Sequence, residues 1–256
     1  MRLILFEIFG FKIYSYGLMI ALGILAASYI FMKKAKKNGY DEDSLLNLII
    51  FSVIFGVLGG KLLFIITEIK SIINNPSILL DFGNGFVIYG AILLGAFTIY
   101  LYCKKKKWDT LEVLDYVAPG VALAQGFGRI GCFLAGCCYG AETSSVFSVV
   151  FPVDSLAPAG VHLHPTQIYS SLFDFALAGF LIWRSKKDKI KGHIFSMYAI
   201  IYSIGRFFIE FLRNDPRGNV GILTTSQFIA IFTLIFGIYI FNIQKLKGRG
   251  KKVEEK

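Results

Sequence analysis

Seven long apolar stretches, separated by short polar segments, limit the folds that this chain can adopt. A helix needs about 20 mostly apolar residues to cross the hydrocarbon core of a bilayer. Apolar residues make up 55% of the chain and charged residues 17%, which leaves too few polar side chains to cover a water-facing surface. The sequence therefore predicts an all-α membrane protein, a bundle of seven transmembrane helices in one integral membrane domain, residues 1–256. The expected spans lie near Ile13–Met32, Leu45–Ile66, Phe86–Cys103, Thr110–Leu134, Thr166–Trp183, His193–Leu212 and Thr224–Ile243.

Lysine-rich segments set the expected orientation of the chain. They follow the first, third, fifth and seventh stretches, at residues 33–37, 104–107, 186–191 and 244–256. Because basic loops are retained in the cytoplasm, the N-terminus is expected outside and the C-terminus inside. Residues 1–12 then form an external arm, 135–165 a small external loop region and 244–256 a cytoplasmic basic tail. The net charge of +10 lies beside apolar stretches, a pattern that indicates contact with anionic lipid headgroups and no nucleic-acid partner.

Polar side chains inside the apolar stretches gather at one depth. A charge at the centre of a membrane helix costs about 2.5–3.5 kcal/mol on insertion scales, so it needs a partner or a function. In the expected orientation, the outer ends of six stretches carry Tyr16, Lys61, Tyr89, Arg129, His164, Gln167, Tyr169, Arg206, Glu210 and Arg213. Glu112 and Asp115 lie at the cytoplasmic side, where ion pairing with lysines 104–107 would account for them. Asp174 lies in the middle of the fifth stretch and receives no assignment.

The charges of the sixth stretch have two interpretations. Arg206 and Glu210 are spaced i,i+4, and Glu210 and Arg213 i,i+3, so these side chains can neutralise one another on one helix face. The alternative is that the arginines bind an anionic ligand at headgroup depth.

Arg129 has no acidic neighbour in its own helical turn, and glycines stand on both sides of it at positions 128 and 131. Glycines let another backbone or a ligand approach closely, and a guanidinium fork matches the geometry of a phosphate. We therefore expect Arg129 to bind phosphate, with snorkelling toward water as the alternative. Gly59-Gly60-Lys61 repeats the pattern of glycines beside a cation.

Three of the four cysteines lie close together, at Cys132, Cys137 and Cys138. Their spacing is neither CxxC nor a disulfide framework. They fit small apolar packing, a disulfide on the outer face, or a zinc site completed by His162 or His164.

Six short motifs in order resemble the bacterial phosphatidylglycerol–prolipoprotein diacylglyceryl transferases. The strongest is Gly128-Arg129-Ile130-Gly131-Cys132-Phe133, followed by Gly136 and Gly140. The others are Tyr16-Gly17-Leu18-Met19, Gly59-Gly60-Lys61, Tyr89-Gly90-Ala91, His164-Pro165-Thr166-Gln167-Ile168-Tyr169, and Tyr202 with Gly205-Arg206-Phe207 and Glu210. The resemblance covers roughly residues 14–228.

The resemblance implies the transfer of a diacylglyceryl group from phosphatidylglycerol to the lipobox cysteine of a preprolipoprotein signal peptide, with release of glycerol phosphate. It implies a multi-pass protein of the bacterial cytoplasmic membrane that acts among membrane lipids without a metal or an organic cofactor. Arg129 and Arg206 would hold the phosphate and stabilise the leaving group. The residues implied for binding phosphatidylglycerol are Arg129, Arg206, Glu210, Tyr16, Tyr202, Lys61, Cys132 and Gly140.

Four positions depart from the family pattern and indicate a cysteine-bearing subgroup. Tyr89 replaces the histidine proposed as the base, and a phenol holds its proton up to about pH 10. His164 is the other candidate for the base. Cys132 replaces an asparagine and Cys137 a frequent glutamate, while Ala141 stands where a basic residue is usual.

Three other functions fit some of these features. A lipid transferase of the same fold with a different acceptor would explain Tyr89 and Cys132. A transporter of an anionic solute would use charged residues within the membrane, but those residues are usually at mid-depth. A purely structural membrane protein would need only the ion pairs.

Overall fold

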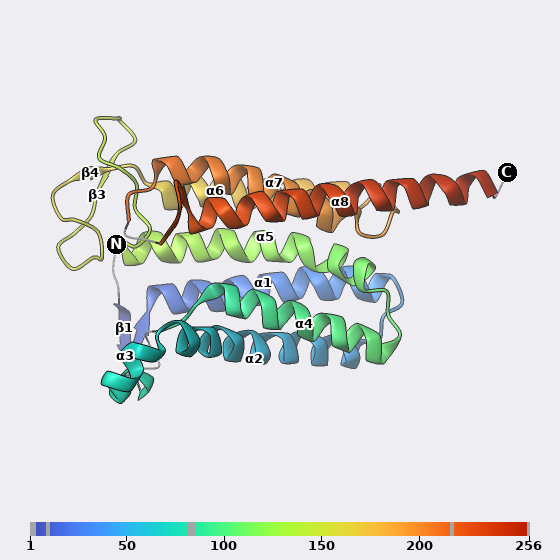
Figure 1. Ribbon diagram of the computed structural model, residues 1–256, viewed down its shortest axis with the longest axis horizontal. Coiled ribbons are helices and arrows are strands. Elements are labelled where there is room, and N and C mark those ends of the chain that lie inside the picture. Colours follow the sequence, from blue (N-terminus) through green and yellow to red (C-terminus); the bar gives the residue numbers. More distant parts are fainter. Residues whose placement is uncertain (1–3, 9–10, 81–84, 216–217, 255–256) are drawn as a thin grey trace. The chain divides into compact units, whose positions relative to one another are not determined.

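The computed structural model describes residues 4–8, 11–80, 85–215 and 218–254 and is built almost entirely of helices (Figure 1). Among these residues the α-helices are α1 Ser15–Lys37, α2 Glu42–Thr67, α3 Ile69–Asn74, α4 Ile88–Lys106, α5 Thr110–Ala135, α6 Thr166–Arg184, α7 His193–Ile209 and α8 Thr225–Glu254. Two short 3₁₀ turns accompany them, η1 Pro76–Leu80 and η2 Glu210–Leu212. A helix thus occupies each of the seven predicted stretches, and the protein is all-helical as expected.

Five of the described helices are long and apolar enough to cross a membrane. They are α1, α2, α5, α7 with its extension to Leu212, and α8 as far as Lys247. The helices α4 and α6, at 19 residues each, are not among them. The chain is therefore an integral membrane protein by the character of its helices, while the third and fifth predicted spans, at α4 and α6, and the orientation stay predictions.

Short antiparallel strand pairs form in the connecting segments. The strands β1 Ile4–Ile8 and β2 Phe11–Tyr14 make a hairpin in the predicted external arm. In the predicted external loop, β3 Val149–Val150 pairs with β4 His162–Leu163. The strands β5 Asn219–Val220 and β6 Leu223–Thr224 precede α8.

Two compact units make up the chain, and each is described by itself. The first unit contains residues 1–31 and 114–256, and the second contains residues 32–113. The boundaries fall inside α1 and inside α5. The single membrane domain expected from the sequence stays a prediction.

In the second unit, α2 and α4 pack so closely that glycine is required where they cross. A Cβ atom added at Gly59 would meet the backbone of Gly90, and one added at Gly90 would meet that of Gly59. The Gly60 carbonyl accepts a hydrogen bond of 3.2 Å from the Val87 amide at the start of α4. At the other end of α2, the Asp41 carboxylate accepts a hydrogen bond of 2.9 Å from the Ser44 amide. This helix cap lowers the pKa of Asp41.

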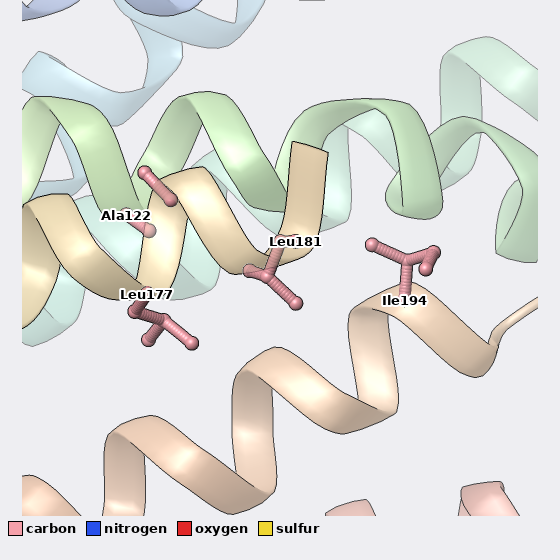
Figure 2. Close-up of a cluster of buried hydrophobic side chains, with 5 residues drawn as sticks. Ala122, Leu177, Leu181 and Ile194 are labelled. Carbon is pink, nitrogen blue, oxygen red and sulfur yellow. The ribbon is translucent and has the colours of Figure 1, made fainter. Parts of the chain in front are cut away.

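In the first unit, the apolar faces of α5, α6 and α7 meet in a buried core. Figure 2 shows Ala122 of α5, Leu177 and Leu181 of α6, and Ile194 of α7 converging on it. The helix α7 also packs along α8 (Figure 1). This three-helix core fixes the rotation of each helix, and therefore which of its polar residues share a face.

Asp115 has a different role from the one expected. Its Oδ2 accepts a hydrogen bond of 2.6 Å from the Gly192 amide, and its Oδ1 accepts one of 2.7 Å from the Phe195 amide. The carboxylate thus caps the N-terminus of α7, where free amides and the helix dipole favour a negative charge. Pairing with the nearby lysines, the expectation from the sequence, was the wrong assignment for this residue.

Candidate functional site

A small cavity in the first unit lies among α5, α6 and α7. Arg129 of α5, Ser170 and Asp174 of α6, and Tyr202, Arg206 and Ile209 of α7 line it. Phe173 and Gly205 complete the wall, and a Cβ atom at Gly205 would overlap the Phe173 ring. Two of the predicted arginines and one predicted tyrosine therefore meet at one place, as the sequence led us to expect.

Arg129 forms neither a hydrogen bond nor an ion pair within the described ranges of the chain. Tyr202 and Asp174 nevertheless lie close enough to act on its charge. The helix α5 comes very close to α6 here. A Cβ atom at Gly126 would overlap the Phe175 ring, and the Gly126 carbonyl accepts a hydrogen bond of 3.0 Å from the Ser171 hydroxyl. A guanidinium held at a cavity wall with its donors uncommitted is suited to an incoming phosphate.

Arg206 belongs to a buried charge cluster with Glu210. The Arg206 Nη1 atom lies 2.6 Å from Glu210 Oε2, and the Nη1 atom of Arg213 lies 3.7 Å from the same oxygen. Thr224 donates a hydrogen bond of 2.8 Å to Glu210 Oε1, and Arg206 donates one of 2.8 Å to Ser226. Glu210 is only 2% exposed, so its carboxylate relies on these partners. The mutual neutralisation read from the spacing is confirmed, and Arg206 also faces the cavity.

Arg213 has a second acidic partner that the sequence did not reveal. Its Nε and Nη2 atoms donate to the two carboxylate oxygens of Asp215 at 2.9 and 2.7 Å, a bidentate pair. Burial disfavours the charged guanidinium, but the hydrogen bonds to Asp215 and the acidic groups nearby together outweigh it, and the pKa of Arg213 is raised. Arg213 therefore stays charged next to Glu210 at any physiological pH.

Asp174 is the site residue that the sequence placed in the membrane without a role. It is buried and lines the cavity, facing the charges of Arg129 and Arg206. The sequence spacing could have revealed this position, because the polar residues of this stretch lie on one helical face. They are Gln167, Ser170, Ser171 and Asp174. That face packs toward α5, as the hydrogen bond from Ser171 to Gly126 shows.

Tyr202 is held in place by ring stacking. Its ring lies against that of Tyr198 with centroids 5.6 Å apart, and the Tyr198 hydroxyl donates a hydrogen bond of 3.0 Å to Gln125. The phenol of Tyr202 therefore has a fixed position at the cavity wall near Arg129.

The three cysteines gather in the turn that ends α5. Gly136 adopts a left-handed conformation with φ of 77°, so the chain reverses and the Cys137 amide donates a hydrogen bond of 3.1 Å to the Cys132 carbonyl. The three sulfur atoms lie within 4.8 Å of one another. Arg129, one helical turn before Cys132, acts electrostatically on Cys132 and Cys138.

Tyr16 lies beside this turn. A Cβ atom at Gly131 would be 3.1 Å from the Tyr16 ring, and the Tyr16 hydroxyl is in the neighbourhood of the three cysteines. Tyr16 is 45% exposed and lies at the edge of the cysteine turn.

His164 and Gly140 form the base of the predicted external loop, residues 135–165. Gly140 donates a backbone hydrogen bond of 3.0 Å to His164, and a Cβ atom at Gly140 would lie 2.6 Å from the His164 Cβ atom. The His164 Nδ1 atom lies 3.4 Å from the Tyr169 hydroxyl. His164 is not one of the residues that line the cavity, and His162 instead bonds Ser148 at 2.9 Å.

Lys61 and Tyr89 belong to the second unit. They flank the crossing of α2 and α4, next to Gly60 and Gly90 respectively. The Lys61 ammonium lies 6.0 Å from the centre of the Phe64 ring. Their predicted roles in binding and catalysis stay predictions.

Sequence comparison identifies the family. The family model of the prolipoprotein diacylglyceryl transferases matches residues 3–243 of the chain. The chain is similar to a protein of Clostridium perfringens named phosphatidylglycerol–prolipoprotein diacylglyceryl transferase 2, with 64% identity over the whole of both chains. It is 62% identical to the phosphatidylglycerol–prolipoprotein diacylglyceryl transferase of Clostridium tetani, over 96% of this chain and 99% of that one.

Transferase 1 of the same Clostridium perfringens strain is 34% identical, over 98% of this chain and 97% of the relative. The family match covers both the α5 motif around Arg129 and the α7 motif around Arg206. The chain therefore belongs to the prolipoprotein diacylglyceryl transferase family.

Proposed function

We propose that this chain transfers the diacylglyceryl group of phosphatidylglycerol to the cysteine thiol of a prolipoprotein, the first step of lipoprotein lipidation. The observation that carries the proposal is the meeting of Arg129 and Arg206 at one cavity, in a chain that matches the transferase family over residues 3–243. Neither the transporter nor the structural alternative is supported by the names of the relatives.

The two arginines suit the phosphate that leaves in this reaction. When the acceptor sulfur attacks the glyceryl carbon, the bond between that carbon and the phosphate oxygen breaks, and negative charge grows on the departing glycerol phosphate. Guanidinium groups fixed in a buried site stabilise such a charge strongly, because they need not reorganise during the reaction. Glu210 holds Arg206 in place by the 2.6 Å ion pair, and Tyr202 offers a hydroxyl at the same wall.

Other members of the site are assigned from the family motif and from their positions. Tyr16 and Cys132 lie at the end of α5 near Arg129, and we assign them to the phosphatidylglycerol site together with Gly140. Lys61 is assigned to lipid binding from the family motif alone. Tyr89 and His164 are the candidates for proton transfer. The acceptor is a lipobox cysteine at the end of a signal peptide, and the protein acts in the bacterial cytoplasmic membrane with seven spans and an external N-terminus.

The direct test is lipidation in cells depleted of their own transferase. Wild-type chain should convert a prolipoprotein precursor into the form that carries a diacylglyceryl thioether, detected by mass spectrometry of the modified peptide. Arg129→Ala should reduce the rate about 100-fold or more, because a transition-state donor is lost. A correctly inserted wild-type chain that leaves the precursor unmodified would refute the proposal.

Arg184→Ala is the matched control for the loss of an arginine. Arg184 ends α6 and is partly exposed, with an ion pair of 3.1 Å to Asp188, and it lies outside the cavity lining. We expect its removal to leave the rate within about twofold of wild type, since Arg184 does not line the cavity and the Asp188 carboxylate keeps its 3.1 Å contact with His193.

A further inference from the structure

We propose that Cys132, Cys137 and Cys138 form a three-thiolate site for a thiophilic cation such as Zn²⁺, and that this ion binds and activates the acceptor thiol. In this proposal Cys132 is a ligand of the ion in place of a lipid contact, and the ion takes the place of Tyr89 or His164 in activating the thiol. The inference rests on the proposed transferase function. It assigns to the cysteine-bearing turn of this chain the thiol activation for which the sequence provides no clear base.

The first support is geometric. The three sulfur atoms lie within 4.8 Å of one another, and in the described part of the chain no other group of three metal-binding side chains comes as close. Zn–S bonds of about 2.3 Å in tetrahedral geometry place sulfur atoms about 3.8 Å apart. Small rotations of the three side chains would therefore bring the cluster to a coordination distance.

The second support is that the backbone of the turn is fixed before any ligand binds. The Gln167 side-chain amide donates a hydrogen bond of 2.7 Å to the Cys137 carbonyl, and the Thr166 hydroxyl donates one of 2.8 Å to the Cys138 carbonyl. Cys138 is held at a φ of 62°, an uncommon conformation for a residue with a side chain. A Cβ atom at Gly136 would lie 2.6 Å from that of Ser155.

The third support is access. Cys132 is 8% exposed and anchors the buried side of the cluster, whereas Cys137 and Cys138 are partly exposed. Three protein ligands with a fourth position open to a substrate is the arrangement of catalytic zinc sites, while structural sites are closed by four protein ligands.

The fourth support is electrostatic. Three thiolates around a divalent ion carry a net charge of −1, and a fourth thiolate makes it −2. Arg129 acts on Cys132 and Cys138, and Arg213 also acts on Cys138. These two guanidinium groups offset the negative charge that the occupied site would carry.

The position of the cluster suits the reaction. Arg129 lines the cavity that we assign to the lipid phosphate, and the same guanidinium lies one helical turn from Cys132. An acceptor thiol bound to the ion would therefore lie next to the phosphate-binding residue, where the glyceryl carbon is expected.

The proposed step balances as follows. The acceptor thiol binds the ion at the open position and releases its proton to solvent, because a thiol coordinated to such an ion is deprotonated. The sulfur lone pair forms the C–S bond to the glyceryl carbon, and the C–O bond to phosphate breaks with its electron pair on the leaving oxygen. The products are the thioether, glycerol phosphate and the released proton, and the ion keeps its charge. A free thiol, with a pKa of about 8.5, would be mostly protonated at neutral pH.

Metal binding tests the site without reference to activity. We would titrate the purified full-length protein in detergent with Cd²⁺ and follow the thiolate-to-cadmium charge-transfer band, with zinc content measured in parallel. The expected result is about one ion per chain. Each of Cys132→Ser, Cys137→Ser and Cys138→Ser should weaken binding by about 100-fold, and Cys103→Ser, in α4, should leave it unchanged. Absence of the band in wild-type protein, or its loss only with Cys103→Ser, would overturn the proposal.

Chelation tests the role of the ion in wild-type protein, so that misfolding of a variant cannot mimic the result. A strong zinc chelator should reduce thioether formation at least about tenfold, and Zn²⁺ but not Mg²⁺ should restore it. Full activity of metal-free protein, or a disulfide between two of the three cysteines found by mass spectrometry in active enzyme, would refute the inference and leave the transferase function intact. If zinc-loaded wild type forms no thioether at all, the proposed function fails instead, and the cadmium titration still decides whether the site exists.

Discussion

Glu210 shows how one buried carboxylate can organise a cationic site. It lies between Arg206 and Arg213 and also accepts a hydrogen bond from Thr224. Burying a charge is unfavourable unless partners replace the lost water, and this cluster supplies two guanidinium groups and a hydroxyl as partners. The same ion pair that neutralises Arg206 also limits its rotation, so a structural contact doubles as a means of aiming the guanidinium.

We expect Glu210→Gln to impair both stability and activity. The amide keeps the shape of the carboxylate but leaves Arg206 without its opposite charge, at a cost of about 3 kcal/mol in the free energy of unfolding. Loss of the fixed orientation should lower the transfer rate about 100-fold. Thermal unfolding in detergent and thioether formation measure the two effects. Glu142→Gln, at an exposed loop position, is the control, and a wild-type rate in Glu210→Gln would refute the positioning role.

Asp174 is predicted to compete with the lipid phosphate for Arg129. The Asp174 carboxyl group and the Arg129 guanidinium line the same cavity, so Asp174→Asn should destabilise the lipid-free protein by about 1–3 kcal/mol. The variant should then gain more stability from phosphatidylglycerol than wild type does, because binding only to the folded state raises the unfolding temperature.

Unfolding temperatures measured at several phosphatidylglycerol concentrations test this expectation. Asp154→Asn changes an exposed loop carboxylate and should leave both values unchanged. A lipid-induced increase that is smaller in Asp174→Asn than in wild type would contradict the competition.

At the scale of elements, the helices were predictable because apolar runs and basic segments mark them out. The predicted stretches 110–134 and 166–183 correspond closely to α5 Thr110–Ala135 and α6 Thr166–Arg184. Contacts between segments that are far apart in the chain could not be predicted from the sequence. Asp115 was assigned to lysines nearby in the chain, whereas residues 192–195 approach it only through the packing of α5 with α7.

The sequence predicted the two arginines of the candidate site but not all of its other residues. Arg129 and Arg206 stood out because a charge in an apolar stretch is unfavourable without a purpose. Asp174 is also a charged residue in an apolar stretch, but the sequence shows no partner for it. Its neighbours are seen only when α5, α6 and α7 are packed together. The cysteine cluster depended on a left-handed turn at Gly136, which residue spacing alone does not reveal.

The crossing of α2 and α4 should be sensitive to a single methyl group. Gly59→Ala would place a Cβ atom against the Gly90 backbone, which cannot move without shifting a whole helix. We expect a loss of about 1–3 kcal/mol in the free energy of unfolding, measured by thermal unfolding in detergent. Gly179→Ala in α6 is the control, because no atom lies within 4 Å of its added Cβ. Equal stability of the two variants would contradict the tight crossing.

At the scale of the whole molecule, the distribution of charge determines which side of the membrane holds the chemistry. The net charge of +10 is concentrated in lysine-rich segments that follow alternate apolar stretches. In the sequence, Lys104–Lys107 and Lys186–Lys191 come just before α5 and α7. The cavity proposed for the lipid phosphate and the cysteine turn involve residues near the C-terminal ends of these two helices. If those lysines face the cytoplasm, the reaction takes place at the outer leaflet.

Labelling of introduced cysteines tests this orientation directly. Ser144→Cys lies in the predicted external loop and Lys186→Cys in a predicted cytoplasmic segment, and both positions are exposed. Because basic segments resist translocation, a membrane-impermeant maleimide should label Ser144→Cys in intact cells and Lys186→Cys only after lysis. The wild-type chain, with its four native cysteines, gives the background to subtract. Labelling of Lys186→Cys in intact cells would invert the topology, and the arginines and the three-thiolate site would then face the cytoplasm, away from the signal-peptide cysteine that the proposed reaction needs.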